Sequence, residues 1–192
     1  ELVGVTLRGG YSTAASGFNA GGGLYVHTAS PTIHGCVIEH NRADGSGGGA
    51  YLRAFDGAFF DNVIRYNEAL SDGTGGGGLS ISEGSGMIWG NQITGNAASG
   101  SSGDGGGVLL YTDADVLFDA NIVEGNVAIN MGGGVRAQSN AATISNNIFA
   151  RNDPSGLNLS YACTGAVINN TFAENVNLGL EVVSGEQEVT AT

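Results

Sequence analysis

A glycine-rich block that runs into an apolar strand recurs along this chain at nearly regular intervals. It reads GGGLYV at 21–26, GGGAYL at 47–52, GGGLSI at 76–81, GGGVLL at 105–110 and GGGVRA at 132–137, with degenerate copies PSGLNL at 154–159 and NLGLEV at 177–182. The last glycine of each block follows the previous one by 22 to 29 residues. A period of this length is typical of solenoids, in which each repeat packs only against its neighbours.

A second motif lies half a period after the first. It reads CVIEHN at 36–41, NVIRYN at 62–67, NQITGN at 91–96, NIVEGN at 121–126, NIFARN at 147–152 and NTFAEN at 170–175. The two motifs alternate along the chain without exception. Chance does not produce six such pairs in register, so both motifs belong to one structural repeat.

Each period shows strand-like alternation and no helical pattern. Apolar residues occupy the first and third places after each glycine block, the middle of the second motif and a position five residues before that middle. Alternation with a period of two indicates strands that bury one face. The pattern therefore predicts three short strands per repeat, separated by turns, with no room for a helix.

A single repeat of this size cannot bury its own apolar row, but a parallel stack can. Each strand then pairs with its equivalent about 4.8 Å away in the next coil, and like residues lie over like. We predict an all-β, single-domain, right-handed parallel β-helix of six to seven coils. Residues 1–20 form an incomplete first coil, residues 21–177 form six repeats, and residues 178–192 begin a further coil or form a tail.

The asparagines of the second motif form two columns in such a stack. Buried amides in register can bond to one another and to the turn backbone, so we interpret both columns as structural ladders. The first column is Asn62, Asn91, Asn121, Asn147 and Asn170, and the second is Asn41, Asn67, Asn96, Asn126, Asn152 and Asn175.

The glycine block and the downstream Phe-x-x-Asn together resemble the repeats of polymorphic outer-membrane proteins, which are autotransported bacterial surface adhesins. Phe149-Ala150-Arg151-Asn152 and Phe172-Ala173-Glu174-Asn175 match that motif, and the other coils have Ile or Val in place of Phe. The resemblance extends from about residue 20 to 180, and more broadly to the pectate-lyase-like superfamily. It implies a secreted or bacterial cell-surface protein. The translocator barrel, secretion signal and cap of that family are not recognised in this sequence.

Charge and cysteine content narrow the classes of partner. The net charge is -12, and all six basic residues are Arg. The negative electrostatic field of such a chain repels nucleic acid and anionic membranes, and no apolar run is long enough to span a bilayer.

The two cysteines lie far apart in the predicted stack. Cys36 replaces Asn in the first column, and Cys163 falls five coils later, about 24 Å away. We therefore expect two free thiols, since a disulfide needs Cα atoms within about 7 Å.

The outward positions after the glycine blocks are the candidate ligand surface. Tyrosine rings can stack on sugars, and ordinary cross-strand packing is the alternative explanation. This surface comprises Tyr25, His27, Tyr51, Arg53 and Tyr111. The leading hypothesis is an extracellular adhesive or architectural scaffold that contacts glycans and has no enzymatic activity.

The alternative function is a polysaccharide lyase or glycoside hydrolase. Glu83 and Asp113 fall in neighbouring coils, with Asp115 close by, and carboxyls about 5–10 Å apart suit glycosidase chemistry. If the chain is an enzyme, these three are its candidate catalytic residues; otherwise they are solvated turn residues.

Asp44, Asp72 and Asp104 lie beside glycines in the loops before the glycine blocks, which makes them candidate calcium ligands. They are weak candidates, because they do not occupy the same position in each repeat and calcium needs six to eight oxygen ligands.

A further set of apolar residues is expected on the outside of the coil. Val37, Val63, Ile122 and Ile148 lie between the inward residues of the second motif, with Phe60 and Trp89 nearby. Two explanations remain open for this interface stripe: it packs against another protein chain, or it reflects β-propensity on a sheet that is partly exposed to solvent.

We also expect the chain, which begins at Glu1, to be a segment of a longer solenoid or to associate end to end or laterally.

Overall fold

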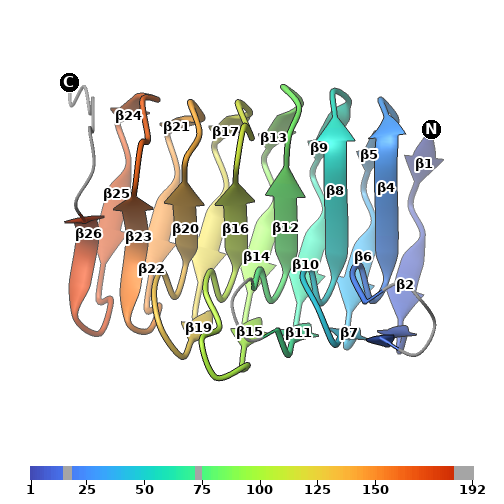
Figure 1. The fold of residues 1–192 in the computed structure, drawn as a ribbon. Helices are drawn as coiled ribbons and strands as arrows, with labels where there is room; N and C mark the ends of the chain where they lie inside the picture. The colour runs from blue at the N-terminus through green and yellow to red at the C-terminus, as the bar shows by residue number, and fades with distance from the viewer. Residues whose placement is uncertain (15–18, 72–74, 184–192) are drawn as a thin grey trace.

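The computed structural model describes residues 1–14, 19–71 and 75–183 of the chain. They form a solenoid in which every strand pairing is parallel and joins equivalent strands of successive coils. Figure 1 shows the coils following one another along a single axis, with β1 and β26 at opposite ends of the stack. The predicted parallel β-helix is confirmed.

Three sheets run the length of the stack and a fourth, shorter one accompanies them; sheet A lies just before the second motif and sheet B lies within it. Sheet A contains β1 (Leu2–Val3), β5 (Thr32–His34), β9 (Ala58–Phe60), β13 (Met87–Trp89), β17 (Leu117–Asp119), β21 (Thr143–Ser145) and β24 (Val167–Ile168). Sheet B contains β2 (Thr6–Arg8), β6 (Val37–Glu39), β10 (Val63–Arg65), β14 (Gln92–Thr94), β18 (Ile122–Glu124), β22 (Ile148–Ala150) and β25 (Thr171–Ala173).

Sheet D follows the glycine blocks and has the longest strands. It contains β4 (Leu24–Ala29), β8 (Ala50–Phe55), β12 (Leu79–Ser82), β16 (Val108–Tyr111), β20 (Val135–Gln138), β23 (Ser155–Ser160) and β26 (Leu178–Val183). Its register places the repeat in columns, with Leu52 beside Ile81 and Ile81 beside Leu110.

A fourth strand, of two residues, follows sheet B in most coils and forms sheet C. It consists of β3 (Tyr11–Ser12), β7 (Arg42–Ala43), β11 (Glu68–Ala69), β15 (Ala97–Ala98) and β19 (Val127–Ala128), and an isolated bridge joins Val127 to Asp153. Sheets A, B and D supply the three predicted strands of each coil, and the sequence did not reveal this fourth one. Two residues are too few to show alternation, although the inward alanine of β7, β11, β15 and β19 is buried.

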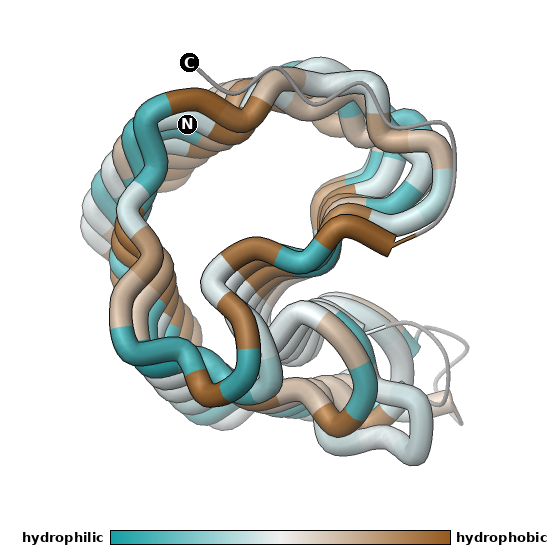
Figure 2. Tube along the Cα trace, turned by 90° about the vertical axis from the view of Figure 1, so that its left-hand side faces the viewer, coloured by the Kyte–Doolittle hydropathy of each residue, from teal (hydrophilic) through white to brown (hydrophobic). Residues whose placement is uncertain are grey.

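The interior is one continuous stack of aliphatic and phenylalanine side chains. Its columns run through Leu52, Ile81 and Leu110 on sheet D and through Phe59, Ile88 and Phe118 on sheet A, all fully buried. Figure 2 looks along the axis and shows the coils overlying one another, with loops projecting from one corner. Matching side chains fill the space because every coil presents the same shape to the next.

Two bends in each coil depend on a residue with positive φ followed by a ladder asparagine. Asp61 precedes Asn62 and Tyr66 precedes Asn67, with φ values of 52° and 53°. The asparagine then turns inward. Asn62 Nδ2 donates to Asn91 Oδ1 at 3.0 Å and to the carbonyl of Ile33 at 3.1 Å. The same bonds recur along both columns, which confirms the predicted structural ladders.

Cys36 takes the place of asparagine in the first ladder. Its amide donates to Asn62 Oδ1 at 2.9 Å, and its thiol points at the carbonyl oxygen of His34, 3.3 Å away. Cys163 is buried beyond the end of β23. Both cysteines are free, as predicted.

Candidate functional site

The open part of the outer face of sheet D lies over its first two strands. Tyr25 of β4 is level with Tyr51 of β8, and their ring centroids are 5.6 Å apart. His27 is level with Arg53, and its ring lies 6.1 Å from that of Tyr25. Both His27 and Arg53 are exposed. The structure thus brings four of the five candidate ligand residues into one patch, the tyrosine patch.

Polar contacts to the next coil hold the tyrosine patch in place. The Tyr51 hydroxyl lies 2.9 Å from Ser82 Oγ. Arg53 Nε donates to Glu83 Oε1 at 3.1 Å, and this bond raises the pKa of the Arg53 guanidinium. These contacts orient the Tyr51 and Arg53 side chains beside Tyr25, which is 37% exposed.

Tyr111 does not belong to this patch. Arg53 pairs with Ser82, which in turn pairs with Tyr111, so two strand spacings separate Tyr111 from Arg53. That separation is about 10 Å. The five predicted residues therefore share a face but do not form one site.

The next four residues of the outward row on sheet D are covered. Ser80, Leu109, Arg136 and Asn158 continue the row of Tyr25 and Tyr51, yet none is more than 6% exposed. The long loop before β16 carries Asp104 over the sheet, where its carboxylate forms a buried ion pair with Arg136. Burial lowers the pKa of the Arg136 guanidinium. Sequence alternation shows which way these side chains point, but it does not show what lies over them.

The calcium candidates that fall within the described residues already contact protein donors. Asp44 accepts a hydrogen bond from the Tyr11 hydroxyl at 2.6 Å and from the amide of Ala14 at 3.1 Å, and the first of these lowers its pKa. Asp104 accepts from Asn130 Nδ2 at 3.0 Å as well as from Arg136. Asp72 lies outside the described residues. Across the described ranges, no three His, Cys, Asp or Glu residues are grouped in a way that could hold a metal ion.

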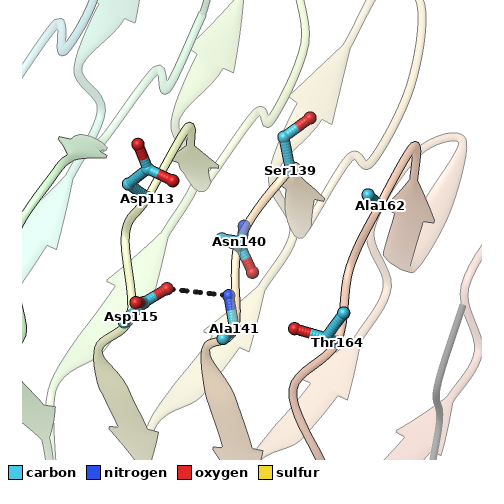
Figure 3. Close-up of a pocket in the computed structure, with 7 residues that line it drawn as sticks. All are labelled: Asp113, Asp115, Ser139, Asn140, Ala141, Ala162 and Thr164. Carbon is cyan, nitrogen blue, oxygen red and sulfur yellow. Dashed lines mark hydrogen bonds between the residues drawn. The ribbon is translucent and has the colours of Figure 1, made fainter. Parts of the chain in front are cut away.

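A pocket lies at the bend between sheets D and A. It has a volume of about 320 Å³ and opens to solvent. Its lining, drawn in Figure 3, is Asp113, Asp115, Ser139, Asn140, Ala141, Ala162 and Thr164. Asp115 Oδ1 accepts a hydrogen bond from the amide of Ala141 at 2.9 Å, and this bond joins the pocket-lining segments of two adjacent coils. Two carboxylates and two hydroxyls thus face one space.

Glu83 does not join Asp113 in this pocket, contrary to the catalytic hypothesis. The Glu83 amide donates to the carbonyl of Thr112, as the amide of a residue level with Asp113 does in a parallel ladder, so the backbone places Glu83 beside Asp113. Its carboxylate instead pairs with Arg53. The pocket combines Asp113 with Asp115, which a pairing of neighbouring coils by sequence distance does not reveal.

The interface stripe lies on the outside of sheets A and B. Ile122 and Ile148 are exposed by 37% and 43%, and Val37 and Val63 are half-buried. Phe60 and Trp89 lie on sheet A. Met87 and Leu117, which are 46% and 37% exposed, extend the apolar surface on the same sheet. Sequence reasoning missed Met87 and Leu117, although alignment of the repeats places both at the outward position that begins each sheet A strand. Association of this face with another chain stays a prediction.

Comparison with known families agrees with the geometry. The family model described as "Right handed beta helix region" matches residues 22–192. The chain belongs to the right-handed β-helix family. This β-helix gave no significant match to curated proteins or to solved structures. Membership supports the coil itself, and the narrower resemblance to polymorphic outer-membrane proteins remains a hypothesis.

Within the described part of this β-helix, no helix has the length and apolar character needed to cross a membrane.

Proposed function

We propose that this β-helix is a secreted or bacterial surface scaffold, akin to the autotransporter adhesins, that contacts glycans through the tyrosine patch. The observation that carries the proposal is the pairing of Tyr25, which is 37% exposed, with Tyr51, at the end of the row where the next four residues are buried. Aromatic rings supply rigid apolar area with a polar tip, which suits the alternating C–H and hydroxyl surface of a sugar. Arg53 and Glu83 beside them supply a donor and an acceptor.

A glycan array with the purified chain tests this proposal. The wild type should retain a subset of glycans that the double variant Tyr25→Ala/Tyr51→Ala loses. Tyr66→Asn is the matched control, because Tyr66 is an exposed tyrosine outside sheet D, at the bend after β10, where it stacks on His40. Equal retention by wild type and double variant would remove the tyrosine patch as the contact surface.

The alternative function is a polysaccharide lyase or hydrolase, and the pocket of Figure 3 is the observation that favours it. One carboxylate of the Asp113 and Asp115 pair would act as acid and the other as base or nucleophile. Incubation with plant and bacterial polysaccharides, followed by reducing-sugar and unsaturated-product assays, tests it. Activity that Asp113→Asn abolishes would replace the scaffold proposal, and no product from any substrate would support the scaffold.

A further inference from the structure

Three aromatic rings stack on the outer face of sheet A. His34 lies over Phe60 with centroids 4.7 Å apart and planes 4° apart, and Phe60 lies over Trp89 at 4.3 Å and 10°. They are the third residues of β5, β9 and β13, directly in register. Both faces of Phe60 are therefore occupied by its neighbours. Ring faces are available only at the two ends of this aromatic ladder.

The Trp89 end of the ladder forms a step. The next residue in register is Asp119 of β17, whose side chain is far shorter than an indole. Asp119 can cover the inner part of the Trp89 face but cannot reach its outer part. Trp89 is accordingly half-buried. Part of Trp89 thus stays exposed where the following coil carries a shorter side chain.

The floor of the step is polar and has one carboxylate oxygen left for an external donor. Asp119 Oδ1 accepts from Ser145 Oγ at 2.6 Å and from Asn146 Nδ2 at 2.7 Å. Asn146 Oδ1 accepts from Asn169 Nδ2 at 2.7 Å. Within the described part of the chain, both hydrogen bonds to Asp119 end on Oδ1, so Oδ2 accepts none. These bonds hold the carboxylate in place and leave Oδ2 without a donor among the described residues, on the residue that is level with Trp89 in the next coil.

We propose that the step between Trp89 and Asp119 is a binding subsite for a neutral sugar residue. The C–H face of the sugar stacks on the indole, and its hydroxyls donate to Asp119 Oδ2 and bond the exposed amide of Asn146. The sugar is neutral rather than a uronate, because a second carboxylate would meet both Asp119 and a chain of net charge -12. An apolar protein surface fits less well, because it would bury Asp119 without a donor for Oδ2. This subsite is on sheet A and does not depend on the tyrosine patch of sheet D.

Trp89 is the only tryptophan in the chain, so its fluorescence reports on this step alone. The probes are cello-, xylo-, manno- and maltotetraose, titrated to millimolar concentration with excitation where tyrosine does not absorb. At least one probe should change the emission saturably. Asp119→Ala should weaken that binding about tenfold, equivalent to about 1.4 kcal/mol. Glu174→Gln removes one negative charge from a distant exposed site and should leave the affinity unchanged.

Four results would overturn the subsite. They are no saturable change with any probe, equal affinity in the folded Asp119→Ala variant, tighter binding of a galacturonate tetramer than of the neutral probes, and an emission change that follows protein concentration without sugar. The last would identify the face as an interface between copies. The Tyr25→Ala/Tyr51→Ala variant separates this subsite from the proposed function. If it loses glycan-array binding but keeps the tryptophan response, both sites stand; if it loses both, the step is not an independent site.

Discussion

At the scale of the residue, the bends of the coil depend on amides that have no access to water. Asn121 shows the full pattern. Its Oδ1 accepts from the amide and the side chain of Asn91 at 3.0 and 2.9 Å, and its Nδ2 donates to the carbonyl of Ile88 and to Asn147 at 3.0 and 3.1 Å. Removing one member leaves partners on both sides buried and unsatisfied, which costs more than the bond itself contributes.

We predict that Asn121→Ala lowers the free energy of unfolding by at least about 3 kcal/mol, because it strands several buried donors and acceptors at once. Urea unfolding followed by circular dichroism measures this. Asn177→Ala, at an exposed position, should change stability by no more than about 0.5 kcal/mol. Similar losses in the two variants would contradict the structural role of the ladder.

At the scale of the element, the glycine blocks make close contact between coils possible. A Cβ at Gly77 would lie 2.4 Å from the carbonyl oxygens of both Ala97 and Gly106. The bend before the second ladder has a different requirement. Gly125 has a φ of 62°, and a Cβ there would meet no other atom within 4 Å. Tyr66 and Arg151 occupy the equivalent bend with φ of 53°.

Gly77→Ala should therefore destabilise the chain by about 3 kcal/mol, because two backbone carbonyls must move. Gly125→Asn should cost no more than about 1 kcal/mol, since L-residues already occupy that bend in other coils. Thermal unfolding of the two variants side by side measures the difference. If Gly77→Ala unfolds at the same temperature as the wild type, the coils do not approach as closely at Gly77 as the structure shows.

An ionic ladder on sheet B links the first three coils. Glu39 lies between Arg65, 2.7 Å away, and Arg8, 3.4 Å away. The hydrogen bond from Arg65 lowers the pKa of Glu39 below its usual 4.5. A lowered pKa in the folded state means that the ladder stabilises the fold above pH 4.5 and loses this effect as the pH falls through the folded value.

We predict that Glu39→Gln lowers the Tm at neutral pH and that its difference from the wild type disappears in strong acid. Thermal melts across a pH series measure the change. Glu174→Gln serves as the comparison, because that carboxylate is 73% exposed and should show little difference at any pH. A difference in Tm between wild type and Glu39→Gln that persists well below pH 4.5 would show that the Glu39 charge is not what stabilises the fold.

At the scale of the whole molecule, the β-helix is nearly one-dimensional. The strands pair with their equivalents in adjacent coils, so the long-range contacts of each coil lie with its immediate neighbours. Stability is then approximately a sum of coil and interface terms. Whole coils are therefore interchangeable units, provided that the register of both asparagine ladders is kept.

Deletion of residues 79–107 should leave a folded, shorter β-helix, because Gly78 then leads into Val108 and Asn62 stacks on Asn121. Deletion of residues 79–93 should prevent folding, because it places apolar columns against bends. Circular dichroism and urea melts of both variants measure the outcome. An unfolded 79–107 deletion would contradict the nearest-neighbour account of stability.

The amino-acid sequence alone determined the coil. In a parallel stack, each residue meets its own equivalent one period later, so the spacing of glycine, leucine and asparagine suffices to place Leu52 on Ile81 and Asn62 on Asn91. The free state of Cys36 and Cys163 follows from the same arithmetic. The tertiary structure alone decided which outer surfaces are open. Loops of unequal length do not follow the repeat: the loop with Asp104 buries Arg136, whereas Tyr25 in the same row is 37% exposed. The Trp89 step likewise arises from the size difference between two stacked side chains, which becomes a surface feature only when the coils are in place.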